Sequence, residues 1–326
     1  MTNFDEIKTL IAPDLSRLES IIKQSLKSNS PLLEQIVDSY LQTKGKQIRP
    51  IIVILSAKFL AGKVSEYVLH GAAAVELLHN ASLIHDDVID ETKKRRGRDT
   101  INSIWDNHIA VLVGDFFVSN ALACAAKTND FRVVRILSEL GKELSTGELD
   151  QIDIANRHTI DEKTYYEIIR KKTASLFRSC VQIAGYAVGA NEHDIDNLAR
   201  FIELLGLCFQ IKDDTFDYFR DDTIGKPTGN DLREGKVTLP LIYALSKPDA
   251  TQRDEMRQML TTSDVLSTEQ IETLIEFAKR EGGIDYAYRS MEKLQNEATS
   301  ILSEYDDSEA KSAFLALFDF IIKRHK

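Results

Sequence analysis

The sequence contains few of the residues that interrupt helices. Its 326 residues include 6 Pro and 15 Gly, and either residue weakens or ends a helix when it lies in the interior. Apolar residues recur three or four positions apart along most of the chain, whereas the strict alternation typical of strands is hard to find. We therefore expect an all-α protein, with roughly ten or more helices in a single domain over residues 1–326.

The sequence also lacks an excess of positive charge. It has 41 Lys and Arg against 51 Asp and Glu, which gives a formal net charge of -10. A general basic surface that could follow a nucleic acid backbone is therefore excluded, and we expect no nucleic acid partner. Any anion that the protein binds must meet a local cluster of basic residues.

Cysteines and long apolar runs are scarce as well. The 3 cysteines, Cys124, Cys180 and Cys208, lie far apart in apolar helical contexts without metal-ligand spacing, which predicts buried free thiols in a reducing compartment. The apolar run at 51–62 is interrupted by Lys58 and falls short of the roughly 20 residues that span a bilayer. We expect a cytoplasmic protein without a signal peptide or a stable membrane anchor.

Two clusters of aspartates have the pattern Asp-Asp-x-x-Asp. In each cluster the first and last aspartates are four positions apart, so they project from one face of a helix. Carboxylate oxygens without cysteine favour magnesium over zinc. A solvated helix end is the ordinary interpretation of one such cluster, but here both copies end apolar segments and precede basic loops. The clusters are Asp86, Asp87 and Asp90, and Asp213, Asp214 and Asp217.

Cationic residues lie in several segments around these clusters. Each alone is most simply a solvated surface charge, but as a set in an acidic protein they indicate phosphate binding, because Arg binds phosphate through two nitrogens and Lys is a mobile point charge. Two aspartate faces opposed across a cleft could clamp a diphosphate through bridging magnesium ions. The cations in question are Lys46, Arg49, Arg95, Arg96, Lys171, Lys172, Lys226 and Lys236.

Such a site suits a reaction in which a diphosphate leaves an allylic carbon. Metal ions and basic residues neutralise the charge that develops on the leaving group. An alkene can then attack the delocalised carbocation, provided that apolar helices such as GAAAVELLHNASLI exclude water.

Several stretches resemble the trans-isoprenyl diphosphate synthases, also called polyprenyl synthetases. The resemblance runs from KGKQIRP to GGIDYA and is carried by ELLHNASLIHDDVID, RRGRDTINSIW, FQIKDDTFDYF and GKPTGNDLREGKVTLPLI. It implies the isoprenoid synthase fold, a helical bundle around a central cavity that usually forms a homodimer. It also implies a transferase that condenses an allylic diphosphate, such as farnesyl or geranylgeranyl diphosphate, with successive isopentenyl diphosphates.

The resemblance assigns roles to individual residues. About three magnesium ions would bind Asp86, Asp90, Asp213 and Asp217, with Asp87, Asp214 and Lys172 also expected in catalysis. The allylic diphosphate would contact Arg95, Lys172 and Lys226, and the isopentenyl diphosphate would contact Lys46, Arg49, His79 and Arg96. Thr173 and Gln210 would lie near the reacting carbons, and Lys236 is a further substrate-binding residue.

Two positions depart from the family pattern. Lys44-Gly45-Lys46 stands where the family usually has Gly-Gly-Lys, and Asp99 stands where it usually has Pro. Both positions lie beside the expected ligands, so they bear on loop geometry rather than on the reaction. The complete ligand set argues against a catalytically inactive partner subunit.

The residues before the first aspartate cluster predict a long product. In the family, bulky residues four or five positions before the first Asp block the growing chain, but here these are Ser82 and Ala81. Residues one turn apart line the same wall, so the cavity would extend past Leu78 towards Phe117 and admit a product of roughly six to ten isoprene units. Such a chain forms the tail of a respiratory quinone. Alternatively, Ala81 and Ser82 simply permit close helix packing.

Three other functions remain open from the sequence. A shorter-chain synthase, making farnesyl or geranylgeranyl diphosphate, would use the same fold. A terpene cyclase also uses acidic helix motifs and magnesium, but it needs no second diphosphate site such as Lys46, Arg49 and Arg96 would form. A non-catalytic partner or metal-binding protein would not need the full set of cations.

Overall fold

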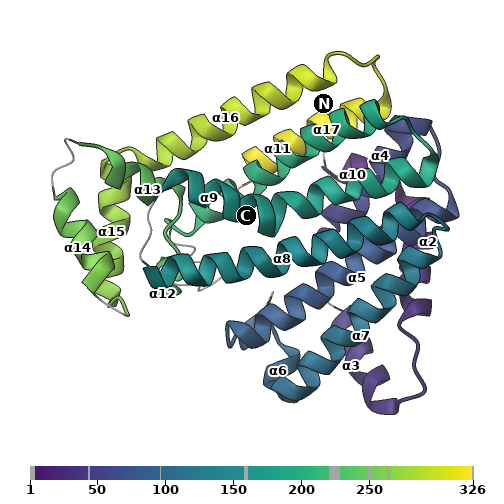
Figure 1. The fold of residues 1–326 in the computed structure, drawn as a ribbon, viewed down its shortest axis with the longest axis horizontal. Helices are drawn as coiled ribbons and strands as arrows, with labels where there is room; N and C mark the ends of the chain where they lie inside the picture. The colour runs from purple at the N-terminus through teal and green to yellow at the C-terminus, as the bar shows by residue number, and fades with distance from the viewer. Residues whose placement is uncertain are drawn as a thin grey trace. The chain divides into compact units, whose positions relative to one another are not determined.

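The chain folds almost entirely into helices, which confirms the all-α prediction (Figure 1). Within the described residues, the strand content is a short antiparallel pair, β1 (Lys94–Arg95) and β2 (Arg98–Asp99). The structure, a computed structural model, describes residues 4–42, 45–95, 97–157, 161–219, 228–248, 252–262 and 265–324.

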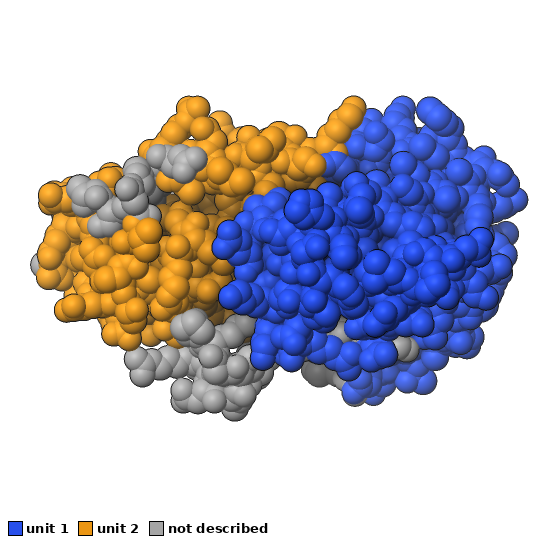
Figure 2. Space-filling view, turned by 90° about the horizontal axis from the view of Figure 1, so that it is seen from below, with its two compact units in different colours: residues 1–141, 177–199, 307–314 blue, residues 142–176, 200–306, 315–326 orange. Residues whose placement is uncertain are grey.

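Two compact units divide the chain, and Figure 2 colours them separately. Unit 1 comprises residues 1–141, 177–199 and 307–314, and unit 2 comprises residues 142–176, 200–306 and 315–326. The single domain expected over residues 1–326 stays a prediction.

Unit 1 contains the first aspartate cluster, at the end of a long helix. Its elements are α1 (Phe4–Leu10), α2 (Ala12–Ser25), α3 (Pro31–Leu41), α4 (Ile48–Ala61), α5 (Glu66–Ile89), β1, β2, α6 (Ile101–Ile104) and α7 (Asn107–Ala126). Four further helices have residues in both units: α8 (Phe131–Arg157), α10 (Ser175–Val188), α11 (Glu192–Phe216) and α17 (Glu309–Lys323).

Helices α5 and α7 pack side by side along much of their length (Figure 1). The contact is close because Gly114 of α7 has no side chain: a Cβ there would lie 2.1 Å from Nε2 of His85. Small residues on α5, including Ala74 and Ala81, are fully buried. Close packing of this kind is what the alternative interpretation of Ala81 required.

Helix α7 is long and apolar enough to cross a membrane by length and composition alone. Within the part of the chain that the structure describes, no other helix passes that test, and 39% of the apolar window is buried inside the protein. Core helices of soluble proteins pass the same test. Some apolar residues of α7 nevertheless face outwards, among them Leu112.

Unit 2 contains the second aspartate cluster, at the end of α11. Its own apolar cluster joins α13, α14 and α15 around buried residues such as Leu241, Met256 and Phe277. The remaining elements of this unit are α9 (Glu162–Ile169), the π-helical turn η1 (Arg170–Ala174), α12 (Asn230–Arg233), α13 (Leu239–Ser246), α14 (Arg253–Thr262), α15 (Thr268–Arg280) and α16 (Gly283–Leu302).

Two helix boundaries in unit 2 agree with local signals in the sequence. Ser267 and Gln270 form a capping box at the start of α15, in which each side chain bonds the other residue's backbone N–H. The break at Gly282-Gly283 separates α15 from α16. Gly282 has φ 78°, and a Cβ on Gly283 would lie 2.1 Å from the carbonyl oxygen of Pro240, so glycine is required at this pair.

Two segments with helical periodicity are interrupted in the structure. Residues 101–127 form α6 and α7, because the Asp106 side chain accepts a hydrogen bond from the Ile109 N–H (2.8 Å) and starts a new helix. Residues 161–188 form α9, the π-turn η1 and α10. The π-turn covers five residues, which is too short a segment for helical periodicity to reveal it.

Candidate active site

The first aspartate cluster closes the C-terminal end of α5. Asp90 is the residue that follows the helix, and its N–H donates to the carbonyl of Asp86 (2.8 Å). Asp87 is buried and accepts a hydrogen bond at Oδ1 from Nε of Arg95 (2.8 Å), and Nη2 of Arg95 forms an ion pair with the same oxygen (2.8 Å). Burial raises the pKa of Asp87, and the charge of Arg95 opposes that rise. The middle carboxylate is therefore held by a protein cation.

The β1–β2 hairpin fixes Arg95 against the end of α5. Asn102, in α6, donates from Nδ2 to the carbonyls of Asp87 (3.0 Å) and Thr92 (3.2 Å). Thr100 donates from its hydroxyl to the same Thr92 carbonyl (2.8 Å). Sequence reasoning missed Asn102, although its segment, RRGRDTINSIW, contributed to the family resemblance. Arg96 lies outside the described residues.

The residues expected to bind isopentenyl diphosphate lie on three segments of unit 1. Lys46 is exposed just before α4, Arg49 is partly buried in the first turn of α4, and His79 is partly buried on α5. The guanidinium of Arg49 lies 5.6 Å from the ring centre of Phe177 in α10, an attractive cation–π arrangement. Their role in substrate binding stays a prediction.

All three acids of the second aspartate cluster are hydrogen-bonded within unit 2. Asp213 accepts at Oδ1 from Nη2 of Arg324 (2.6 Å). Asp217 accepts from the backbone N–H groups of Asn230 (2.9 Å) and Asp231 (3.0 Å). It thereby ties the end of α11 to the segment that forms α12.

Asp214 is the most deeply buried acid of this cluster and belongs to a chain of hydrogen bonds. Its Oδ2 accepts from the hydroxyl of Tyr165 (2.6 Å), and its Oδ1 accepts from Nε2 of Gln210 (2.7 Å). Oε1 of Gln210 in turn accepts from the hydroxyl of Thr173 (2.7 Å). Burial raises the pKa of Asp214 to about 6, against the lowering effect of these hydrogen bonds. Burial also raises the pKa of Tyr165 well above its usual value.

Arg324, close to the C-terminus, is a site residue that sequence reasoning missed. Its side chain is buried; besides binding Asp213, it donates to the carbonyl of Phe209 (3.1 Å). The guanidinium lies 4.2 Å from the ring centre of Phe209 and 5.6 Å from that of Phe216. Burial lowers the pKa of Arg324, and Asp213 opposes this effect. An arginine in the terminal segment IIKRHK gave no periodic signal that could have assigned it to a site.

Lys172 is held by acids and amides of α8. Its Nζ contacts Oε2 of Glu148 and Oε1 of Gln151. The approach of the two segments requires Gly147, because a Cβ there would lie 2.9 Å from Cγ of Lys172. Sequence reasoning missed Glu148 and Gln151, whose spacing of three within GELDQ places them on one face of α8.

A cavity of about 690 Å³ in unit 2 gathers several of these side chains. It has a polar part with Lys172, Thr173, Gln210 and Asp214. Apolar residues complete its lining: Ile168, Val237, Ile242, Leu260 and Leu266.

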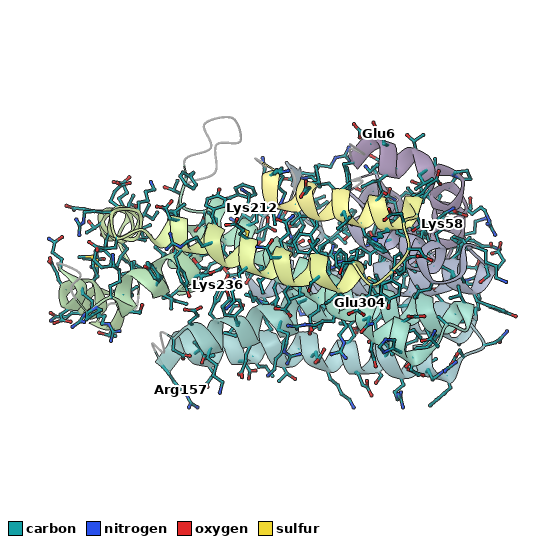
Figure 3. The ribbon with its side chains drawn as sticks, turned by 90° about the horizontal axis from the view of Figure 1, so that it is seen from above. Glu6, Lys58, Arg157, Lys212, Lys236 and Glu304 are labelled. Carbon is teal, nitrogen blue, oxygen red and sulfur yellow. The ribbon has the colours of Figure 1, made fainter. Side chains whose placement is uncertain are left out.

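Asp231 and Lys236 also line this cavity, and the side chain of Lys236 is labelled in Figure 3. Sequence reasoning missed Asp231. Burial raises the pKa of Asp231 well above its usual value, and the neighbouring Asp214 and Asp217 reinforce the shift. Lys236 forms an ion pair with Glu234 (2.5 Å). Lys226 lies outside the described residues.

The donor atoms suit a hard divalent cation. The two aspartate clusters supply only carboxylate oxygens, the ligand type that magnesium prefers. Across the ranges that the structure describes, however, no three His, Cys, Asp or Glu side chains converge into a ready-made metal cage. Magnesium is usually held by one or two carboxylates together with substrate phosphates, so such a cage is not required.

Comparison with known proteins points to one family. The chain matches the polyprenyl synthetase family over residues 30–278. It is 32% identical to the octaprenyl diphosphate synthase of Haemophilus influenzae, with 100% of this chain and 98% of that protein covered. It is 34% identical to heptaprenyl diphosphate synthase component 2 of Bacillus subtilis, with 95% and 88% covered.

Solved structures agree with these relatives. A decaprenyl diphosphate synthase from Rhodobacter capsulatus has a TM-score of 0.91 at 29% identity, with 99% of both chains covered. A geranylgeranyl pyrophosphate synthase from Bacteroides thetaiotaomicron has a TM-score of 0.83 at 36% identity, with 98% of both chains covered. A Caulobacter crescentus polyprenyl synthase complexed with calcium and isoprenyl diphosphate has a TM-score of 0.90 at 28% identity, with 100% of this chain and 99% of that chain covered. The chain therefore belongs to the polyprenyl synthetase family and is a prenyl diphosphate synthase, an enzyme that acts on prenyl diphosphates.

Proposed function

We propose that this enzyme is magnesium-dependent and extends an allylic diphosphate with successive isopentenyl diphosphates to a long all-trans polyprenyl diphosphate. The observation that carries the proposal is the cavity of unit 2, where Lys172, Thr173, Gln210 and Asp214 meet. One cation, two neutral side chains that carry oxygen atoms, and one acid of the second cluster therefore line the same cavity. This is the combination that ionisation of an allylic diphosphate requires.

We propose that Asp86 and Asp90 of the first cluster, and Asp213 and Asp217 of the second, hold about three magnesium ions together with the substrate diphosphate. When bound, the ions supply charge neutralisation for the leaving diphosphate. The calcium and isoprenyl diphosphate in the Caulobacter relative support a divalent cation that binds beside a diphosphate.

The side chains then have separate tasks in the condensation. Lys172, Arg95 and Lys226 bind the allylic diphosphate, and the C1–O bond breaks as negative charge passes to that group. The alkene of isopentenyl diphosphate, held by Lys46, Arg49, His79 and Arg96, attacks C1 and forms the new C–C bond. A proton then leaves C2 of the isopentenyl unit and is taken up by the diphosphate released from the allylic substrate, so no protein base is needed.

We propose that the product is long because the residues of α5 just before the first cluster are too small to block the growing chain. Ala81 is small and fully buried, and Leu78 lies one turn before Ser82 on α5. Phe117 of α7 is fully buried and packs edge-on against Tyr40, with ring centres 5.5 Å apart; we assign Phe117 to the floor. The octaprenyl and decaprenyl relatives support a long product, whereas the geranylgeranyl relative supports the shorter alternative. We propose that the long product becomes the side chain of a quinone.

We propose that a second copy of the chain covers the exposed apolar face of α7. Leu112 is 66% exposed, and Val111 and Leu122 are also exposed. Exposed large apolar side chains, when they gather on one surface, mark an interface. The same assembly would explain why α7 is so apolar without crossing a membrane. The Bacillus relative is named as a component, so a different second subunit is the competing arrangement. We place the enzyme in the cytoplasm, as the free buried thiols suggest.

The test of the proposed interface is the mass of the protein in solution. Leu112→Glu should convert a dimer to a monomer in light scattering, while Glu139→Ala, on an exposed face of α8, should leave the dimer intact. A wild-type protein that is monomeric at micromolar concentration would overturn the homodimer.

The test of the reaction is incubation with farnesyl diphosphate, labelled isopentenyl diphosphate and magnesium, followed by phosphatase treatment and sizing of the alcohols. We expect products of about forty to fifty carbons, and none when a chelator removes the metal. Products that stop at about twenty carbons would keep the reaction and move the floor of the tunnel above Leu78. No incorporation would contradict the proposed reaction.

A further inference from the structure

Tyr165 is buried beside the proposed active site but has no role in the reaction described above. It lines the cavity of unit 2 and donates its hydroxyl hydrogen to Oδ2 of Asp214 at 2.6 Å. Asp214 also accepts from Gln210, and Gln210 accepts from Thr173. The chain Tyr165–Asp214–Gln210–Thr173 therefore runs from a buried phenol to two side chains that face the cavity.

This chain decides which end of the Gln210 amide points to Thr173. A carboxylate only accepts hydrogen bonds, so Gln210 must turn its NH2 group to Asp214. Its carbonyl oxygen, the negative end of the amide dipole, then lies on the side of the Thr173 hydroxyl. If the amide were reversed, the positive NH2 group would take that position instead.

We propose that Tyr165 and Asp214 are positioning residues that hold the carbonyl oxygen of Gln210 towards the allylic carbocation. The inference rests on the proposed function. A fixed dipole whose negative end faces the cation lowers the barrier to ionisation, because it needs no reorganisation as charge develops. Tyr165 contributes by occupying the second oxygen of Asp214, which keeps the carboxylate turned so that its other oxygen meets Gln210.

Two substitutions test the two halves of this chain. Tyr165→Phe removes the hydroxyl and lets Asp214 turn. Asp214→Asn keeps the size and shape of the side chain. The single oxygen of its amide is needed to accept the hydrogen bond from Tyr165, so its NH2 group faces Gln210, which must then present its carbonyl oxygen. In that variant every hydrogen bond can be made again, with the Gln210 amide reversed and Thr173 as acceptor.

The matched control is Tyr218→Phe. Tyr218 is another buried tyrosine of unit 2, and its hydroxyl shares a hydrogen bond with the hydroxyl of Thr238 at 2.9 Å. The substitution removes a buried tyrosine hydrogen bond of the same kind. Its effect on catalysis measures what the loss of any such bond costs.

The measurements are kcat and KM for both diphosphates, together with positional isotope exchange of an allylic diphosphate that carries ¹⁸O in its bridging position. Exchange in the presence of an unreactive isopentenyl analogue reports ionisation without condensation. We expect kcat and the exchange rate to fall about tenfold in Tyr165→Phe and about a hundredfold or more in Asp214→Asn. KM values should stay within about twofold, and Tyr218→Phe should stay within about twofold throughout.

The double variant keeps the inference testable if one substitution also affects folding. Because both residues act through Gln210, Tyr165→Phe should cost little in an Asp214→Asn background. Additive losses, losses confined to KM, or an unchanged exchange rate in Tyr165→Phe would overturn the positioning role. A wild-type enzyme without turnover would instead overturn the proposed function on which the inference rests.

Discussion

The two aspartate clusters have the same pattern but different surroundings. In the first, the buried middle acid Asp87 pairs with a cation, Arg95. In the second, the buried middle acid Asp214 has neutral donors only, Tyr165 and Gln210, and the cation Arg324 pairs with the first acid, Asp213. The two clusters thus share one pattern of three carboxylates, but the residues around corresponding acids differ in charge. Each difference predicts a measurable effect.

The largest effect should come from the acids that we assign to the metal. Asp86→Asn and Asp213→Asn each replace a metal-binding carboxylate by an amide, and we expect kcat to fall about a thousandfold or more in both. Steady-state rates at several magnesium concentrations would measure the loss. If either variant kept more than about a tenth of the wild-type rate, that cluster would not hold the catalytic metal.

The next effect concerns the length of the product. It involves only α5, the helix that ends in the first aspartate cluster. Ala81→Phe should fill the wall of the proposed tunnel and shorten the product from about forty to fifty carbons to about fifteen to twenty, with substantial activity retained. Ala81→Ser, which stays small, should leave the length unchanged. Chromatography of the dephosphorylated products measures both, and an unchanged product in Ala81→Phe would place the tunnel elsewhere.

A smaller effect separates the two arginines. Arg324 binds an acid that we assign to the metal, and a fixed positive charge beside the site repels a divalent cation. In the absence of substrate, Arg324→Gln should therefore bind Mn²⁺ about tenfold more tightly, with Arg324→Lys close to wild type. Arg95→Gln should change the affinity less, because Arg95 pairs with the middle acid. Electron paramagnetic resonance measures the Mn²⁺ affinity. If Arg324→Gln bound Mn²⁺ as tightly as the wild-type enzyme or more weakly, the proposed difference between the two arginines would be wrong.

The smallest effect is on stability and compares the two middle acids. The pKa of Asp214 rises on folding from 3.8 to about 6, so the folded state holds that proton more tightly than the unfolded state. Its contribution to stability falls as pH rises from about 4 to about 6 and stays low above it. At pH 8, Asp214→Asn should thus stabilise the fold by about 1–3 kcal/mol.

Asp87→Asn should change stability less at the same pH. Burial raises the pKa of Asp87 as well, but the charge of Arg95 opposes that rise, and the substitution leaves the Arg95 guanidinium without a charged partner. Urea denaturation at pH 8 measures both variants. An equal gain in stability in the two variants would show that the neutral and cationic surroundings of the two acids do not differ in effect.

Sequence reasoning reached most of the fold and part of the site. The all-α class, the capping box at Ser267 and the break at Gly282 follow from local signals. Glu148, Asn102 and Arg324 could not be found in this way, because each matters through a contact with a residue distant in sequence: Lys172, Asp87 and Asp213. The π-turn at Arg170–Ala174, which carries Lys172 and Thr173, lies close to Gly147, and this contact also joins segments distant in sequence.

The most direct test of the central claim is the number of metal ions bound with and without a diphosphate. All three acids of the second cluster already accept hydrogen bonds from protein groups, and no metal cage is preformed among the described residues. We therefore predict weak Mn²⁺ binding to the enzyme alone and about three ions per chain once an unreactive allylic diphosphate analogue is added. Tight binding of three ions without the analogue, or no added binding with it, would contradict a site that the substrate completes.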